Sequence, residues 1–354
     1  MSTHHSSVSR PVVAYPEHRL SLAGMLTLAR ELYGHARHFR AIERMISNTQ
    51  IAERRFALPL EQIGKQAGLA ERTRLYMEHA RPLARGVIED ALNEAALMPA
   101  DIDLIITSSC TSFVMPSLDA YLINDLGFPP TTRRLPIAQL GCVAGVSALL
   151  MANDYCRAYP EARVLVVAVE LSSLCFFPEH DDLTSAVCAS IFGDGAMACV
   201  VSGAAHDGSG LRLGEGMSYT MPDSEHYIRY EVGDGGFHLT LDRGVMHSIP
   251  KIAPTIQDFV RSRGVEALDF VVAHTGGRRI LDGIVSSLGI DERLVGQSRA
   301  SLREVGNTAS VSVFDVLRRA FDNERPELVE RPNHGIVVAF GPGFTMALLE
   351  ATWA

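Results

Sequence analysis

The chain has 354 residues, of which 47% are apolar and 21% are charged, as in an ordinary globular protein. This length suits one large domain or two fused units that share a sizeable core. A formal net charge of −9 and the absence of basic runs exclude a general nucleic-acid or polyanion binder, and no apolar run is long enough to cross a bilayer.

The cysteine pattern argues against metal-binding and disulfide-rich classes. No CxxC pair occurs, so neither a zinc site nor a disulfide framework is predicted. The N-terminal stretch MSTHHSSVSR is polar and lacks the apolar core of a signal peptide. We therefore expect a reduced, cytoplasmic protein without a metal. The cysteines are Cys110, Cys142, Cys156, Cys175, Cys188 and Cys199.

The first third of the chain reads as mostly helical. We expect a disordered leader over residues 1–10, helices over 20–34, 41–48 and 73–95, and a buried strand over 103–107. Arg44 and the AERR stretch that ends at Arg55 could bind a phosphate group or form a solvated basic face. The sequence leaves both alternatives open.

The stretch from Leu135 to Tyr155, LPIAQLGCVAGVSALLMANDY, predicts a short strand, a glycine turn and a helix. Cys142 lies at or just before the helix N-terminus, where the dipole favours an anion and acidifies a thiol. Small neighbours at Gly141 and Gly145 leave room for a substrate carbonyl. The structural alternative is a buried cysteine at a helix start.

Buried strands then alternate with helices to the end of the chain. Aliphatic runs at residues 163–169, 269–273 and 335–340 are typical of central strands, and the last strand ends at Trp353. This alternation predicts an α/β layered fold. In each half a buried strand delivers a reactive side chain to a glycine-containing turn, which suggests a duplicated βαβ core.

Three residues on such turns could form one site: Cys142, His274 and Asn307. A cysteine beside a histidine suits nucleophilic catalysis, and an asparagine amide stabilises an oxyanion or enolate without titrating. Each residue also has a structural explanation, since the histidine could satisfy core polar groups and the asparagine could cap a helix. Spacing alone does not separate these explanations.

Five ordered motifs carry a resemblance to a known family. LPIAQLGCVAG, IFGDG, AHTGGRRILD, GNTAS and AFGPGFT resemble, in order and spacing, the type III polyketide synthases, the chalcone-synthase-like family. The match covers the chain from about Arg10 to Trp353. Through CTSFVMPSL, SEHYIRYEV and GFHLTLD it is most similar to bacterial members, the phloroglucinol and tetrahydroxynaphthalene synthases.

The resemblance implies a thiolase-like fold, with two duplicated βαβ-rich halves that form a layered α-β-α-β-α core. Residues 11–204 would form the N-terminal half, which carries the nucleophilic cysteine, and residues 205–354 the C-terminal half, which carries the histidine and asparagine. A homodimer is implied as well. The substrates are an acyl-CoA or acyl-ACP starter and a malonyl-CoA-type extender, with no metal or redox cofactor.

The catalytic roles follow position by position from the resemblance. Cys142 matches the nucleophile that carries the acyl group, and His274 and Asn307 match the pair that holds the thioester carbonyl during decarboxylation and condensation. Phe192 and Phe237 match the two gatekeepers between the CoA tunnel and the cavity.

Other matching positions are expected to bind substrate. Met115 matches the residue that reaches across the dimer into the partner's cavity. The remaining residues that we expect at the cavity are Cys110, Cys175, Phe176, Tyr230, Ala309, Gly276, Gly277, Gly341, Pro342 and Gly343.

The CoA-binding positions depart from the plant enzymes. Of the basic residues that hold CoA phosphates there, only Arg44 has a counterpart, because Ala41 and Asn48 occupy the other two positions. We expect CoA contacts from Arg44 and Arg279. Other basic residues that could take the place of the missing CoA-phosphate contacts are Arg54, Arg55 and Arg278.

A second departure bears on the product. Phe176 and Phe177 stand where phloroglucinol and naphthalene synthases carry Tyr-Gln, which makes the cavity more apolar. With the small residues Cys175 and Ala309, this favours an aliphatic starter, few extensions and closure to an alkyl α-pyrone. Phloroglucinol or 1,3,6,8-tetrahydroxynaphthalene formation from malonyl-CoA alone is the first alternative.

Two more distant alternatives remain from the sequence. A ketoacyl-ACP synthase III-like condensing enzyme also uses Cys, His and Asn, but its HQAN-like context differs from the HTGG found after Ala273, and the GPGFT ending also disagrees. A thiolase-fold scaffold with a dead site would have lost a catalytic residue, whereas all three are present.

Overall fold

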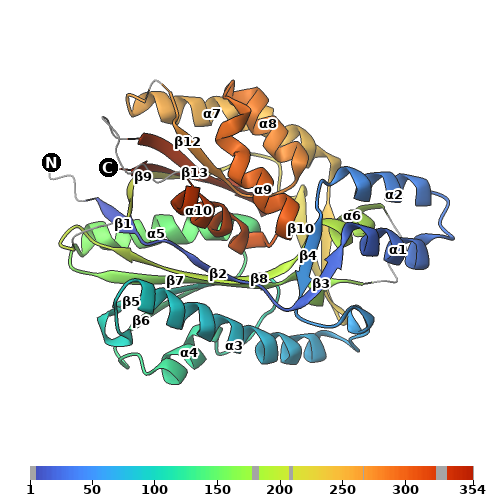
Figure 1. Cartoon of the computed structure of the whole chain (residues 1–354), viewed down its shortest axis with the longest axis horizontal. Coiled ribbons are helices and arrows are strands. Elements are labelled where there is room, and N and C mark those ends of the chain that lie inside the picture. The colour runs from blue at the N-terminus through green and yellow to red at the C-terminus, as the bar shows by residue number, and fades with distance from the viewer. Residues whose placement is uncertain (1–4, 178–182, 207–209, 266, 324–332, 354) are drawn as a thin grey trace.

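The computed structural model describes residues 5–177, 183–206, 210–265, 267–323 and 333–353. Two helices and a small two-stranded sheet from the first sixty residues lie at one end of the molecule, beside the body that contains the large sheet (Figure 1). The helices are α1 Leu22–Tyr33, α2 Phe39–Asn48, α3 Leu69–Glu94, α4 Leu118–Leu126, α5 Ala144–Ala158, α6 Leu183–Ile191, α7 Ser248–Ser262, α8 Arg278–Leu288, α9 Gly296–Val305 and α10 Ser312–Asn323.

The strands form one ten-stranded mixed sheet and two small two-stranded sheets. The large sheet runs in the order β12-β13-β14-β9-β1-β8-β7-β5-β6, with β2 paired to β8. Its strands are β1 Ser6–Val8, β2 Val12–Ala14, β5 Leu104–Ser108, β6 Arg133–Ile137, β7 Arg163–Leu171, β8 Asp194–Ser202, β9 Leu211–Thr220, β12 Phe270–Ala273, β13 Asn333–Gly341 and β14 Thr345–Trp353. The small sheets pair β3 His18–Ser21 with β4 Glu53–Phe56, and β10 Ile228–Gly233 with β11 Gly236–Leu241.

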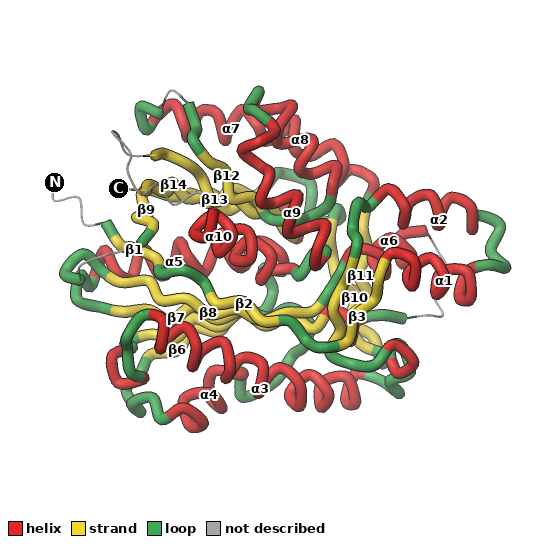
Figure 2. Tube along the Cα trace, viewed as in Figure 1, coloured by secondary structure: helices red, strands yellow, loops and turns green. Residues whose placement is uncertain are grey.

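The predicted α-β-α-β-α layering is confirmed. Figures 1 and 2 show α5 and α10 between two groups of strands, with α3 and α4 below and α7, α8 and α9 above. One apolar core includes Leu149 of α5, Val316 of α10 and strand residues from both groups. Because both central helices bury apolar side chains toward each group of strands, the two groups enclose a common interior.

The N-terminal strand corrects one prediction. Residues 6–8 were expected in a disordered leader, but they form β1, which pairs antiparallel with β8 and with β9. Val8 is completely buried, and the Ser6 hydroxyl donates to Asn153 at 2.7 Å. This strand links the two groups of strands into one sheet, so it is a structural element despite its polar sequence.

Parallel pairing brings the carboxyl ends of several strands together. In β5, Ser108 lies beside Ile137 of β6 and Ala168 of β7. In the other half, Ala273 at the end of β12 lies beside Val338 of β13. Ligand sites in α/β sheets commonly lie at such strand ends. The loops that follow these strands therefore converge on the centre of the molecule.

Candidate active site

The three residues predicted to act together reach this centre from different segments. Cys142 follows β6 in a short 3-10 helix at Gly141–Val143, immediately before α5. His274 directly follows β12, and Asn307 lies between α9 and a 3-10 turn at Ala309–Val311. The side chains of His274 and Asn307 are each 2% exposed.

The glycines around Cys142 serve the packing of the protein. Gly141 has φ of 54°, and a Cβ there would lie 2.8 Å from the Pro342 ring. A Cβ on Gly145 would lie 2.5 Å from the carbonyl oxygen of Ser310. Only glycine allows these approaches. The small residues were expected to leave room for a substrate, but here they let two other segments of the chain approach the nucleophile.

The thiol of Cys142 is not acidified as the helix start suggested. Burial raises its pKa to about 12, and the nearby Glu170 carboxyl raises it further, while a hydrogen bond from the Asn307 side chain lowers it. Desolvation of the thiolate thus outweighs the hydrogen bonds that favour the thiolate. At neutral pH the sulfur keeps its proton until a base accepts it.

His274 is held so that it can be that base. Its Nδ1 lies 2.5 Å from the Ser312 hydroxyl oxygen, and that hydroxyl donates to the carbonyl of Ala309 at 2.9 Å. Because the only serine proton is used in this way, the network assigns a proton to Nδ1 and a lone pair to Nε2. Burial lowers the pKa of His274 to about 3, so the imidazole is neutral.

The two halves of the Asn307 amide perform different tasks. Its Oδ1 accepts a hydrogen bond from the backbone N–H of Ala309 at 2.9 Å, which supports the following turn. Its Nδ2 is then the atom that donates toward Cys142. The capping explanation and the functional explanation of Asn307 therefore hold together, because they use different atoms.

Asn307 is also joined to the backbone on either side of Phe192. Its backbone N–H donates to Ile191 at 2.8 Å, and the N–H of Gly193 donates back to the Asn307 carbonyl at 3.0 Å. These bonds form an isolated bridge between Phe192 and Asn307. These bonds hold the backbone around Phe192 against the backbone of Asn307.

Glu170 is a site residue that the sequence reasoning missed. It is fully buried at the end of β7, and it accepts bonds from the Ser310 hydroxyl at 2.5 Å and the Cys110 N–H at 3.0 Å. Burial raises the pKa of its carboxyl to about 7, although these donors oppose the shift. The sequence does contain a signal that could have identified Glu170, because this carboxylate directly follows a continuous aliphatic strand.

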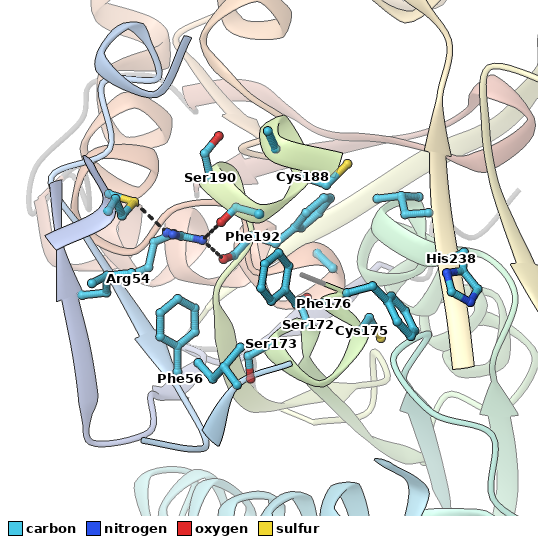
Figure 3. Close-up of a pocket in the computed structure, with 18 of the residues that line it drawn as sticks. Arg54, Phe56, Ser172, Ser173, Cys175, Phe176, Cys188, Ser190, Phe192 and His238 are labelled. Atoms are coloured by element: carbon cyan, nitrogen blue, oxygen red, sulfur yellow. Dashed lines mark hydrogen bonds between the residues drawn. The ribbon is translucent and has the colours of Figure 1, made fainter. Parts of the chain in front are cut away.

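One cavity of about 150 Å³ opens at Cys142. This is well above the roughly 10–15 Å³ that one water molecule requires, so the cavity has room for a ligand. In Figure 3, Phe176 and Phe192 project into its centre and Cys175 lies beside them. The predicted residues on its wall are Cys110, Cys142, Cys175, Phe176, Phe192, Tyr230, Ala309 and Pro342.

The other predicted residues are not among those that line this cavity. Phe237 is half-buried on β11, with its ring centroid 5.7 Å from that of Tyr230. Met115 is 87% exposed and does not reach the cavity of its own chain. The remaining members of this group are His274, Asn307, Gly276, Gly277, Gly341 and Gly343.

Gly276 lies close to the catalytic imidazole. A Cβ on Gly276 would come within 3.4 Å of Nε2 of His274. A larger residue here would therefore crowd Nε2 of His274. This contact gives Gly276 a role in shaping the site that does not require direct contact with substrate.

The basic residues considered for CoA separate into two groups. Arg44 on α2 and Arg279 on α8 have exposed side chains that can meet a phosphate. Arg54 is 4% exposed and lines the cavity, and its guanidinium donates to the carbonyls of Ala189 and Phe192. These contacts engage its charge with the protein itself.

The two other arginines named as substitutes have acidic partners. Arg55 pairs with Glu53 at 2.8 Å, and Arg278 pairs with Asp282 at 3.5 Å. Within the described ranges no helix is long and apolar enough to span a membrane, and no group of side chains there is arranged to hold a metal ion.

Two family models match adjacent parts of the chain. The N-terminal domain of chalcone and stilbene synthases matches residues 39–205, and the C-terminal domain matches residues 212–351. Phloroglucinol synthase of Pseudomonas fluorescens is 41% identical over 351 residues, which cover 98% of this chain and 99% of that protein.

A solved structure agrees with the same assignment. The crystal structure of 1,3,6,8-tetrahydroxynaphthalene synthase from Streptomyces coelicolor, a bacterial type III polyketide synthase, has a TM-score of 0.94 at 41% identity and covers 98% of this chain and 99% of its own. The alpha-pyrone synthesis polyketide synthase-like Pks18 of Mycobacterium tuberculosis is 32% identical over 320 residues, covering 86% of this chain and 80% of that protein.

Proposed function

The chain belongs to the chalcone and stilbene synthase family, the type III polyketide synthases, and we propose that it extends an acyl starter held on Cys142 with malonyl-CoA-type units. It is therefore an acyl-transferring condensing enzyme. Membership in this family decides against the ketoacyl-ACP synthase considered from the sequence. The position of Cys142 between the Asn307 amide and the cavity carries the proposal.

The first step loads the starter. Nε2 of His274 takes the thiol proton of Cys142, and the resulting thiolate attacks the thioester carbonyl of the acyl donor. The donor leaves as a thiolate that takes its proton from water, the acyl group stays on sulfur, and Nε2 of His274 keeps the proton of Cys142. Burial disfavours an isolated thiolate and an isolated imidazolium. Proton transfer between them creates both charges together, and their attraction offsets part of that cost.

The second step forms the new carbon–carbon bond. Malonyl thioester loses CO₂, and the electron pair of the broken bond becomes an enolate. The Nδ2 donor of Asn307 and the protonated Nε2 of His274 stabilise the negative oxygen. The enolate carbon then attacks the acyl group on Cys142, and the cysteine sulfur leaves as thiolate. A pre-oriented donor costs no reorganisation at that moment, which is why the Oδ1 contact with Ala309 matters.

We infer an aliphatic starter and closure to an alkyl α-pyrone from the wall of the cavity. Phe176, Phe192 and Cys175 present apolar or weakly polar surface near the nucleophile. Burial of a hydrocarbon against such a wall stabilises binding by about 0.8 kcal/mol per CH₂. The alpha-pyrone relative supports the same product class by its name.

A second candidate has its own support. The two relatives at 41% identity are named for phloroglucinol and 1,3,6,8-tetrahydroxynaphthalene. An aromatic product made from malonyl-CoA alone is therefore the alternative. Tyr230 on the cavity wall supplies a hydroxyl that such a polar intermediate could use.

Mass spectrometry of products distinguishes these candidates. The purified enzyme is offered malonyl-CoA alone, and then malonyl-CoA with acyl-CoAs of graded length, beside a Cys142→Ala control. Pyrones that require an aliphatic starter and vanish in the control support the first candidate. An aromatic product from malonyl-CoA alone replaces it with the second. No condensation product under either condition contradicts both.

We further propose a homodimer built on the β6 edge of the sheet. Among the described residues β6 pairs with β5 alone, and residues 133–136 are exposed. Leu135 on this strand is 37% exposed and Met115, on the loop between β5 and α4, is 87% exposed. Exposed strand edges with apolar side chains pair readily with a second chain. Sedimentation equilibrium should show a dimer that Leu135→Asp weakens and Val232→Asp, at an exposed site on β10, does not.

A further inference from the structure

The cavity continues well beyond the nucleophile. The same continuous space that Cys142 and Ala309 line also extends beneath α1, between this helix, the β4 strand and α6. Figure 3 shows Phe56 and Arg54 on one side of the view and Cys175 and His238 on the other. The cavity therefore joins a region at Cys142 to a second region beside α1.

The far region is walled by one face of α1. Met25, Leu28, Ala29 and Leu32 line it, and their spacing of three, one and three residues is that of a single helical stripe. A surface helix normally closes such a stripe against the core, but here part of it borders open space. Residues that face the stripe across the space include Phe56, Leu60, Ile63 and Ala186.

Arg54 stands at the junction of the two regions. Its guanidinium donates to the Phe192 carbonyl at 2.9 Å, to the Ala189 carbonyl and to the Met25 sulfur at 3.0 Å (Figure 3). These contacts engage the guanidinium with the protein itself. The Arg54 guanidinium therefore lies where the two regions of the cavity meet. The stripe on α1 beyond it is apolar.

We propose that this region, defined as the α1 chamber by Met25, Leu28, Ala29, Leu32 and Phe56, holds the hydrocarbon tail of the acyl group carried by Cys142. The inference rests on the proposed use of an aliphatic starter and adds the place where its tail lies. An alkyl tail that starts at the sulfur reaches the chamber without leaving the cavity.

Other parts of the substrates fit this chamber less well. A pantetheine arm carries two amides, and a growing polyketide carries alternate carbonyls. Such groups lose free energy when they leave water without hydrogen-bond partners. The stripe on α1 offers only hydrocarbon and thioether surface, and the exposed CoA candidates Arg44 and Arg279 do not line the cavity. The chamber thus selects an unsubstituted hydrocarbon.

Competition between starters tests the proposal. Equal hexanoyl-CoA and dodecanoyl-CoA are offered with malonyl-CoA, and the ratio of long-tailed to short-tailed products is measured by mass spectrometry. Ala29→Phe fills the chamber and should lower this ratio by at least roughly tenfold, as expected when a pocket excludes one or more methylenes. Leu32→Ala enlarges the chamber and should raise the ratio. Ala23→Phe, at an exposed position on the same helix, should leave it unchanged.

The outcomes separate this inference from the function on which it rests. If the wild type makes both alkyl products and neither chamber variant changes the ratio, the tail lies elsewhere and the aliphatic-starter function stands. If the wild type accepts no aliphatic starter, that function and the chamber inference both fail. Should Ala29→Phe not fold by circular dichroism, Leu32→Ala alone decides.

Discussion

Nδ1 of His274 lies 2.5 Å from Oγ of Ser312, and this contact sets which imidazole nitrogen can take a proton. The Ser312 hydroxyl donates its hydrogen bond to the carbonyl of Ala309, so Nδ1–H of His274 must donate to the Ser312 oxygen. Ala309 has φ of 48°, an uncommon conformation for a residue with a Cβ, and its N–H binds Asn307. One strained turn thereby orients both groups that serve Cys142.

Replacement of Ser312 by alanine should therefore impair catalysis without removing a group that touches substrate. Without its acceptor, Nδ1 no longer fixes the tautomer, and we expect kcat to fall by about a hundredfold with KM little changed. Steady-state kinetics across a pH series checks this. Ser248→Ala removes another buried serine, which bonds to Gly244 at the start of α7, and should keep kcat within about twofold of wild type. Equal kinetics in the two variants would remove Ser312 from the mechanism.

Asn307→Asp separates the two tasks of the amide. A carboxylate keeps an oxygen for the Ala309 N–H but has no donor for the enolate. We expect decarboxylation of malonyl-CoA to fall by about 10²–10³-fold, as for loss of one oxyanion donor. Intact-protein mass spectrometry should still detect acyl transfer to Cys142. Decarboxylation at the wild-type rate would show that His274 alone stabilises the enolate.

Glu170→Gln should change how stability depends on pH. The folded carboxyl titrates near pH 7 instead of at the ordinary 4.5, so the folded state holds an extra proton between these values. Its contribution to stability is complete below pH 4.5 and is lost as pH rises through about 7. A glutamine does not ionise. The melting temperature of the variant, relative to wild type, should therefore be higher at pH 8 than at pH 5.

The same variant should also make Cys142 more reactive. Above pH 7 the wild-type carboxylate opposes formation of the thiolate, and the neutral amide does not. Alkylation of Cys142 by iodoacetamide should be faster in Glu170→Gln at pH 8 and follow a lower apparent pKa. Glu78→Gln, at an exposed site on α3, is the control. An unchanged alkylation profile would mean that the carboxylate does not act on the thiol.

Local patterns in the sequence predicted the layered fold because the buried strands are continuous aliphatic runs. β7 and β8 bury nearly every residue, and the strand predicted over residues 103–107 is observed as β5 Leu104–Ser108. The short strand β1 was missed because SSV carries no apolar alternation of its own. Its strand conformation depends on pairing with residues about two hundred positions away, such as Ser202.

The site was predictable in part for the same reason. Cys142 and His274 end up on turns after strands, as the motifs implied. Glu170 and Ser312 act through contacts with segments far away in the chain, and no local sequence pattern predicts such contacts. The thiol of Cys142 shows the limit most clearly, since the helix start is a local property whereas the desolvation that outweighs it is set by the whole surrounding core.

Arg54 supplies the last prediction. It is buried between β4 and the end of α6, where its guanidinium holds the carbonyl of Phe192 and stacks 5.0 Å from the Phe56 ring centroid. Desolvation lowers its pKa to about 9, so its burial has a cost that these contacts offset. In Arg54→Met two buried carbonyls lose their donor, which should reduce the free energy of unfolding by roughly 2 kcal/mol.

The functional effect of Arg54→Met should exceed that loss of stability. Release of the Phe192 carbonyl lets the gatekeeper move, and the backbone bridge passes this motion to Asn307. A displacement of about 1 Å in such a positioned group costs on the order of a hundredfold in kcat/KM. Arg54→Lys keeps a donor and should recover part of both losses, while Arg55→Met, next to it but bonded to Glu53, should cause neither. Thermal denaturation and kinetics of the three variants check this, and a methionine variant as active as wild type would limit Arg54 to a structural role.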